Sequence, residues 1–186
     1  MPRDYTRLPV NKIRRKDRAV EEDQWIKSLL EKAPFGTFAM VSNGMPIVNS
    51  NIFYYDKAVN AIYFHTAGEG RTRSSIEKDA AICFSISEMG RLLPAERALN
   101  FSVEYKGVAA FGRVMIVESP SEAKELLQKI CDKYFPHLQP DKDYATPSPE
   151  ELKRTTVYKM TIDHWSGKQK LVEDDFPGAF FYGSKS

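Results

Sequence analysis

A succession of β-type segments separated by turn residues is the sequence feature that most restricts the fold of this chain. Phe35–Val41 runs into Ser42-Asn43-Gly44, and Asn-Gly between two apolar runs is a strong signal for a two-residue hairpin turn. Because few helical segments interrupt the pattern, it predicts a mainly β (α+β) chain, an antiparallel barrel or sandwich and not a parallel βαβ sheet. The later β-type segments are Pro46–Tyr54, Ala61–Thr66, Ala80–Ser87, Phe101–Val117 and Thr155–Trp165.

Helices are expected at three places. Glu21–Lys32 is amphipathic, with acidic residues at its start, and it places Trp25 and Leu29 on one face. A short helix is expected after Gly70. A longer one should run from Ser119 through Lys133, with a serine as its N-cap.

Two segments leave alternatives open. Phe101–Val117 is too long for one straight strand, so Gly107 and Gly112 mark either bulges or a hairpin bend. Met89–Pro94 is expected to be a loop, either a lid over a cleft or a plain connection. Residues 134–150 also read as a loop because they contain four prolines.

The chain has 186 residues and neither an internal repeat nor a linker, so a single domain over 1–186 is expected. Residues 1–20 form an irregular N-terminal arm in this interpretation. The C-terminal tail, 171–186, is acidic and then aromatic, and it should pack on a partner or fray.

Charge and hydropathy limit the partners. The net charge of +2 gives no reason to expect nucleic-acid binding, and the basic run Lys12–Arg18 favours a solvated arm or a subunit clasp. No apolar run approaches the ~18 residues that span a bilayer, and charges follow Met1 where a signal peptide would be apolar. We therefore expect no nucleic-acid and no membrane partner.

Cysteine and histidine spacing does not indicate a metal site. Cys83 lies in an apolar strand segment and Cys131 in a helix, so both are expected to be reduced, buried thiols. His137 and His164 have no ligand-like spacing to other candidate ligands. The expected compartment is the cytoplasm.

The segment 61–79 (AIYFHTAGEGRTRSSIEKD) has the composition of a phosphate-binding turn. A buried strand leads into a glycine turn, and two arginines, Arg71 and Arg73, then open a helix. First-turn amides lack intrahelical partners and the helix dipole favours an anion there, while arginine adds bidentate hydrogen bonds. The alternative is a solvated turn whose basic residues are incidental, and spacing alone does not decide between the two.

The order of several motifs resembles the pyridoxamine 5′-phosphate oxidase-like flavin-binding proteins, in particular the branch with the nitroimidazole-resistance proteins. The motifs are FAMVSNGMPIVNSNIFYYD, YFHTAGEGRTRSSIE, SVEYKGVAAFGR and the late WSGK, which together extend over residues 35–168. The resemblance implies a split β-barrel, a homodimer, and FMN held in a groove at the dimer interface.

Carried over position by position, the resemblance implies a set of FMN-contacting residues. Strand residues should follow the isoalloxazine edge and ribityl chain, the turn should face the phosphate, and later residues should line the cleft. These residues are Asn49, Ser50, Asn51, Ile52, His65, Thr66, Arg71, Thr72, Arg73, Ser102, Tyr105, Trp165 and Lys168.

The chain also departs from the family pattern. Thr72 stands where relatives often have lysine, so either Arg73 supplies that charge or Arg71 and hydroxyls hold the phosphate alone. Asn49 stands where the vitamin-processing oxidases tend to have arginine. The Asp174-Asp175 tail would repel a substrate phosphate, which argues against pyridoxine phosphate as the substrate.

Three positions have both a structural and a functional interpretation. His65 is either a core histidine or the candidate catalytic residue, a donor to flavin or substrate, since imidazole titrates near neutrality. Trp165 is either a strand-end core aromatic or a wall of the flavin pocket. Asn49 and Asn51 share one strand face, which is either solvated or in contact with a polar ligand.

The sequence therefore predicts an FMN-dependent oxidoreductase that reduces a small molecule such as a nitroaromatic, a quinone-like compound or another flavin. Flavin would carry the redox chemistry, which fits the lack of an obvious general acid or base. A non-catalytic flavin-binding or sensor protein is the alternative, because the sequence has no nicotinamide-binding motif. A pyridoxamine 5′-phosphate oxidase is the less favoured alternative, because Asp174 and Asp175 would repel the substrate phosphate.

Overall fold

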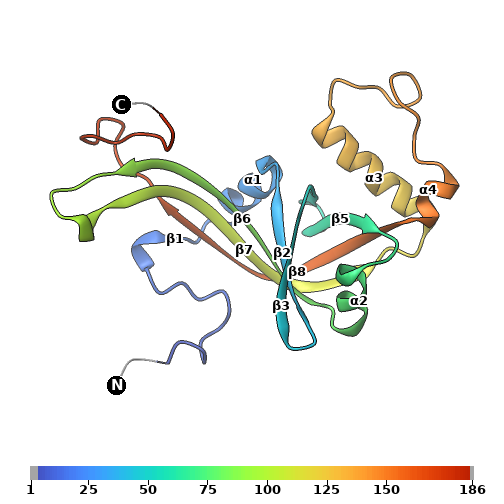
Figure 1. Ribbon diagram of the computed structural model, residues 1–186, viewed down its shortest axis with the longest axis horizontal. Helices are drawn as coiled ribbons and strands as arrows, with labels where there is room; N and C mark the ends of the chain where they lie inside the picture. Colours follow the sequence, from blue (N-terminus) through green and yellow to red (C-terminus); the bar gives the residue numbers. More distant parts are fainter. Residues whose placement is uncertain (1–3, 185–186) are drawn as a thin grey trace.

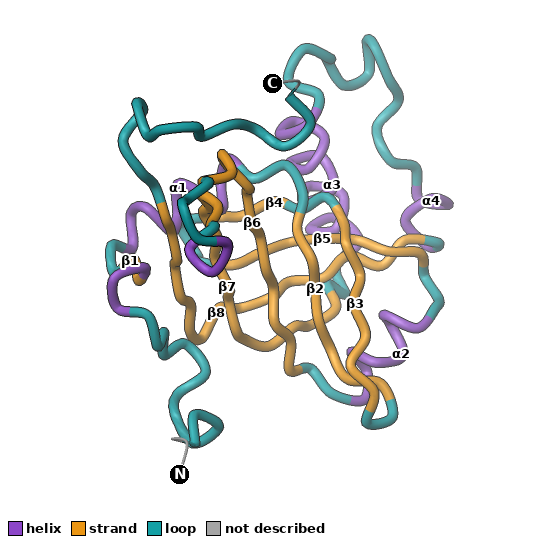
Figure 2. Tube along the Cα trace, turned by 60° about the vertical axis from the view of Figure 1, so that its left-hand side comes forward, coloured by secondary structure: helices purple, strands orange, loops and turns teal. Residues whose placement is uncertain are grey.

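One twisted, curved antiparallel sheet forms the body of the protein (Figures 1 and 2). The computed structural model describes residues 4–184. Within that range the strands pair in the order β3-β2-β6-β7-β8-β5-β4, and β1 pairs with β8. The pairing of these strands is antiparallel throughout, as the sequence predicts. The strands are β1 (Ala19–Val20), β2 (Gly36–Ser42), β3 (Met45–Asn51), β4 (Tyr54–Asp56), β5 (Ala61–Ala67), β6 (Ala81–Leu93), β7 (Ser102–Ile116) and β8 (Thr155–Lys170).

The β2–β3 hairpin forms at the predicted Asn-Gly turn. Asn43 and Gly44 have φ values of 50° and 77°, the paired positive values that a type I′ hairpin turn requires. The following β-type segment, predicted as one strand over Pro46–Tyr54, is divided into β3 and β4. The strand is interrupted at residues 52 and 53. The backbone N–H and C=O of Phe53 both bond the Tyr134 hydroxyl at 3.1 Å and not a neighbouring strand.

The segment Met89–Pro94 is not a loop, which corrects that prediction. Strand β6 continues to Leu93, which pairs with Ser102, and the register shifts between Met89 and Leu92. Gly90 and Pro94 are residue types common in turns, which is why the sequence predicts a loop. In the structure, glycine is needed at position 90 because Glu104 of the neighbouring strand lies close to it. A Cβ on Gly90 would lie 2.8 Å from the Glu104 Cβ.

Strand β7 is one continuous element, and only one of its two glycines marks an irregularity. Its pairing with β8 shifts register between Phe111 and Gly112, where a Cβ would lie 1.9 Å from the Thr161 carbonyl oxygen. Gly107 pairs regularly with both neighbouring strands, so the bulge predicted there is absent from the pairing of β7. The long β6–β7–β8 ribbon reaches across the molecule in Figure 1.

The helices pack around the sheet (Figure 1). Helix α1 packs against β4 and β7, and α3 packs against β4, β5 and β8. Helix α4 was not predicted from the sequence; Ser148 caps it reciprocally with Glu151 in a capping box. None of the helices in the described range is long and apolar enough to cross a membrane. The helices are α1 (Asp23–Lys32), α2 (Arg71–Lys78), α3 (Pro120–Tyr134) and α4 (Pro149–Lys153), with short 3-10 turns η1 (Lys16–Arg18) and η2 (Ala98–Asn100).

Aromatic side chains fill the concave side of the sheet. Phe38, Phe64 and Phe84 come from three different strands and are fully buried. Phe38 stacks on Phe64 with ring centroids 3.9 Å apart, and Phe64 stacks on Tyr158 at 4.7 Å. This core fixes the ends of β3 and β5, where the predicted ligand-binding residues lie.

Both terminal segments are attached to the sheet. The arm is not wholly irregular, because its last residues form η1 and then β1, with Ala19 opposite Lys168. The tail returns over its own chain: Leu92 and Phe180 form a bridge, and the Arg91 guanidinium donates to backbone carbonyls of residues 172–174. Intrachain packing therefore replaces the expectation that the tail frays.

Candidate functional site

The turn between β5 and α2 presents uncapped backbone amides. Gly70 stands at the N-cap with φ 130°, a conformation that only glycine adopts readily, and no side chain caps the helix. The first backbone bond of α2 runs from the Ser74 N–H to the Gly70 carbonyl. The preceding amides therefore have no acceptor in the described chain, and the helix dipole adds partial positive charge. This arrangement suits a phosphate.

The two arginines of the turn differ in their contacts. Arg73 is occupied: its Nη1 donates to the Gly68 carbonyl (2.7 Å) and the Thr156 hydroxyl (3.2 Å), and its Nε to Glu77 (2.8 Å). Arg71 is exposed, and its side chain forms no hydrogen bond or ion pair in the described chain. Relatives often have lysine at the position of Thr72, which leaves two alternatives for the phosphate contact here. The geometry favours Arg71 together with hydroxyl groups, because the Arg73 side chain is already bonded within the turn.

The end of strand β3 is joined to the turn by its two asparagines. Asn49 Nδ2 donates to the Thr72 hydroxyl at 3.1 Å, and Asn51 Nδ2 donates to the His65 carbonyl at 2.6 Å. Both side chains are partly buried, whereas Ser50 lies on the opposite strand face, where its hydroxyl bonds Thr37. The paired asparagines thus connect β3 to β5 and to the first turn of α2.

His65 contributes an unsatisfied polar atom to this cluster. Its Nδ1 is buried without a hydrogen-bond partner in the described structure. Burial lowers the pKa of the imidazole, so the ring is neutral at pH 7. Thr66 follows it and bonds the Ala67 carbonyl and the Tyr158 hydroxyl, and Ile52 lies partly buried beside Asn51. A neutral imidazole at this place can donate to or accept from a polar ligand.

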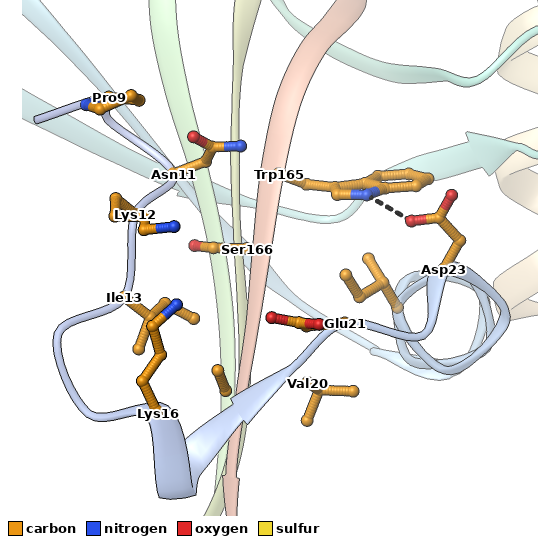
Figure 3. Close-up of a pocket in the computed structure, with 12 residues that line it drawn as sticks. Pro9, Asn11, Lys12, Ile13, Lys16, Val20, Glu21, Asp23, Trp165 and Ser166 are labelled. Carbon is orange, nitrogen blue, oxygen red and sulfur yellow. Dashed lines mark hydrogen bonds between the residues drawn. The ribbon is translucent and has the colours of Figure 1, made fainter.

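The remaining predicted site residues lie elsewhere. Trp165 is held by Asp23, which accepts from the indole Nε1 at 2.9 Å, and Lys27 lies 5.9 Å from the ring centroid. Trp165 and residues of the N-terminal arm line a cleft of about 400 Å³. Figure 3 shows these lining residues in close-up. Ser102 accepts a hydrogen bond from the Lys170 ammonium group.

Within one chain, the predicted site residues around the β5–α2 turn lie far from the predicted site residues near the end of β8. His65 is opposite Val157 near the start of β8, whereas Tyr105 is opposite Lys170 at the end of the strand, and Lys168 precedes it. At about 3.3 Å per residue, these positions are roughly 40 Å apart along β8. We call them the turn end and the arm end of β8.

Sequence reasoning missed Asp23 and Lys133. Asp23 was read only as part of a helix start, because its bond to Trp165 joins residues far apart in the chain. Lys133 donates to the carbonyls of Ala33 and Phe53, and burial lowers its pKa to about 8. Its partners belong to two distant segments, so no local pattern could reveal the contact.

The fold is therefore an antiparallel sheet whose β5–α2 turn presents free backbone amides. The model of the pyridoxamine 5′-phosphate oxidase family matches residues 22–169, and the chain belongs to that family. The resemblance noted from the motifs is thereby confirmed. A comparison with curated protein sequences gave no match.

Solved structures share the fold. A flavocytochrome from Azotobacter vinelandii superposes with a TM-score of 0.75 at 21% identity, covering 94% of this chain and 85% of that one. An FAD- and haem-binding protein from Mycobacterium smegmatis has a TM-score of 0.74 at 18% identity, with 82% and 73% covered. A candidate 5-nitroimidazole antibiotic resistance protein from Bacteroides thetaiotaomicron has 0.67 at 21%, with 81% and 86% covered. At these identities the similarity establishes the fold.

Proposed function

We propose that this protein is a flavoprotein that holds FMN by its phosphate at the turn end of β8. The observation that carries the proposal is the uncapped N-terminus of α2 beside an unengaged arginine, Arg71. A flavin phosphate needs donors that remain charged or fixed, and this turn offers both. Flavin binding by structural neighbours, whose names include FAD-binding proteins, supports the proposal.

The arrangement of the site residues also supports a symmetric homodimer. A single chain offers the phosphate turn at one end of β8 and Ser102, Tyr105, Trp165 and Lys168 at the other. Two copies related by a two-fold axis would bring the turn end of one chain to the arm end of its partner, giving two equivalent sites. Exposed apolar side chains on β2 and β3, Val41 (53% exposed) and Val48 (70%), offer surface for such a contact.

Within this site the chain's own residues bind and orient the cofactor. The bound flavin supplies the hydride or electron chemistry. Asn49 and Asn51, fixed by Thr72 and by the His65 carbonyl, would meet the polar edge of the ligand. Neutral His65 would exchange a hydrogen bond with flavin or substrate at its ring. The partner's aromatic residues would exclude water from one face of the ring system.

We assign the protein as an oxidoreductase that reduces a small acceptor, such as a nitroaromatic compound, in the cytoplasm. The structural likeness to a candidate 5-nitroimidazole resistance protein supports the acceptor class. The alternative is a non-catalytic flavin-binding or sensor protein with the same site. A pyridoxamine 5′-phosphate oxidase is disfavoured because the exposed carboxylates Asp174 and Asp175 would repel a substrate phosphate.

The visible spectrum of the purified protein tests both parts of the proposal. Flavin absorption, or stoichiometric uptake of added FMN with weaker uptake of riboflavin, is expected. Bleaching by NADH or NADPH and reoxidation by an added nitroaromatic would identify the enzyme. Binding without turnover would identify the sensor alternative, and equal affinity for FMN and riboflavin would contradict the phosphate site.

A further inference from the structure

Three basic residues lie at the arm end of β8, and none of them is assigned to the proposed flavin site, although Lys170 donates to the Ser102 hydroxyl of that site. Arg15 and Arg18 flank the η1 turn, and both bond one carboxylate, Asp17, at 2.6 and 2.9 Å. Pairing of Ala19 with Lys168 holds this turn against β8. Lys170 belongs to the same strand end.

The positive charge of this cluster exceeds what the surrounding protein neutralises. Asp17 is the only carboxylate in the described chain that forms an ion pair with Arg15 or Arg18. Burial lowers the pKa of Lys170, and the charges of Arg18 and Arg15 lower it further. Gathering like charges is unfavourable unless an anion joins them. The cluster therefore has one carboxylate, Asp17, for three positive charges, and a further anion would stabilise it.

Glu104 on β7 is the nearby carboxylate, and its oxygens already accept other hydrogen bonds. Glu104 accepts from the Arg91 Nε and Nη2, both at 2.8 Å, and from the Val172 backbone N–H at 3.0 Å. Its oxygens are thus engaged in holding the C-terminal tail.

We propose that Arg15, Arg18 and Lys170 form a second anion site, which binds the diphosphate group of a dinucleotide. Two guanidinium forks and an ammonium group match the several oxygens of a diphosphate better than a single carboxylate. Tyr105 on β7 lies opposite Lys170 in the β7–β8 pairing, so an aromatic residue on which a base can stack lies at the same strand end. Asp17 fixes the two arginines in place.

The dinucleotide identity rests on the proposed function, whereas diphosphate binding does not. A diphosphate at this end of β8 has two possible sources: the adenosine half of FAD used as cofactor, or a nicotinamide dinucleotide that delivers electrons to FMN. Both carry the same group. The cluster would then explain how a chain without a nicotinamide-binding motif receives a nicotinamide donor, or how its site accepts the larger flavin.

Direct titration with inorganic pyrophosphate tests the site without requiring flavin. The full-length Arg71→Gln protein serves as the parent, because that change weakens the turn-end anion site. Calorimetry should show pyrophosphate binding to this parent. Adding Arg18→Gln and Lys170→Gln together should weaken it by about tenfold or more. Adding Arg113→Gln is the matched control and should leave the affinity unchanged, because this exposed arginine of β7 has no side-chain hydrogen bond or ion pair in the described structure.

Arg15→Gln separates a loss of binding from a loss of folding. The Arg15 side chain is half exposed (49%), so its replacement should not unfold the chain. It should weaken pyrophosphate binding by roughly threefold while the melting temperature is kept. Unchanged affinity in both cluster variants, or no binding to the parent, would overturn the proposal. Cluster variants that dissociate into monomers, with no pyrophosphate binding by the parent, would assign the cluster to a subunit contact instead.

Displacement of bound pyrophosphate by dinucleotides shows which of the two molecules supplies the diphosphate group. FAD that displaces pyrophosphate from flavin-free parent protein, with FMN unable to do so, identifies the cofactor as the source. NADPH that displaces it, with reduced nicotinamide mononucleotide unable to do so, identifies the electron donor. If neither dinucleotide competes, the dinucleotide assignment is overturned even though the anion site stands.

Discussion

The two ends of strand β8 present hydrogen-bond donors of different origin. At the turn end the donors are backbone amides of α2, assisted by Arg71, and they belong to one continuous segment. At the arm end the donors are side chains from the arm and from the last residues of β8. The first arrangement arises from local backbone geometry, and the second exists only when distant segments pack together.

This difference predicts different sensitivities to substitution. Backbone amides cannot be removed by mutating one side chain, so the turn end should lose only the contribution of Arg71. Side chains at the arm end can be removed singly, and their loss also affects how the arm and tail are held. The predictions below use this contrast.

The largest expected effect is that of Arg71→Ala on FMN affinity. Removing one charge-assisted bond to a desolvated phosphate should cost about 1.5–3 kcal/mol, or roughly ten- to a hundredfold in affinity. Riboflavin lacks the phosphate and should bind this variant almost as it binds the wild type. Fluorescence titration with both ligands measures the contrast, and equal losses for the two would move the phosphate away from the turn.

The next effect concerns the clamp that holds the tail at the arm end. Hydrogen bonds from Arg91 lower the pKa of Glu104 to about 2, from an ordinary value near 4.5. A carboxyl group whose pKa is lowered on folding stabilises the native state above pH 4.5, and this contribution is lost as the pH falls towards 2. Glu104→Gln should therefore lower the melting temperature at pH 7 by several degrees, and the difference from wild type should shrink as the pH approaches 2.

Acid titration of unfolding, followed by circular dichroism, checks this prediction. Limited proteolysis should also cut the variant's tail first, near Val172, because the backbone contacts of Arg91 weaken there. A difference between variant and wild type that persists unchanged at pH 2 would mean that Glu104 contributes by packing alone.

A smaller effect is expected for Arg73→Ala. Its guanidinium bonds Gly68, Thr156 and Glu77, so its loss should loosen the turn and lower the melting temperature by roughly 2–4 °C. The affinities for FMN and for riboflavin should both fall modestly, because a looser turn affects the whole site. Selective loss of FMN, as for Arg71→Ala, would show that Arg73 contacts the phosphate directly.

The sequence predicts the sheet and the turn end well because both depend on local patterns. The Asn43-Gly44 hairpin and the opening of α2 follow from turn and helix-start residues. The extension of β6 through Gly90 could not be predicted, since that glycine is required by contact with Glu104 on another strand. The engagement of Arg73 by Thr156 and the bond from Trp165 to Asp23 likewise join residues far apart in the chain.

In the proposed dimer each flavin site is completed by two chains, and complementation between two impaired variants tests this arrangement. Arg71→Ala impairs the turn end and Trp165→Ala the arm end, so each homodimer should hold FMN poorly. When the two variants are unfolded together and refolded as a mixture, half of the dimers are mixed, and each mixed dimer contains one site with both intact halves. FMN binding of wild-type affinity should then return to about a quarter of all sites. Failure of any tight site to return, with mixed dimers demonstrated by mass spectrometry, would place the whole site within one chain and contradict the account.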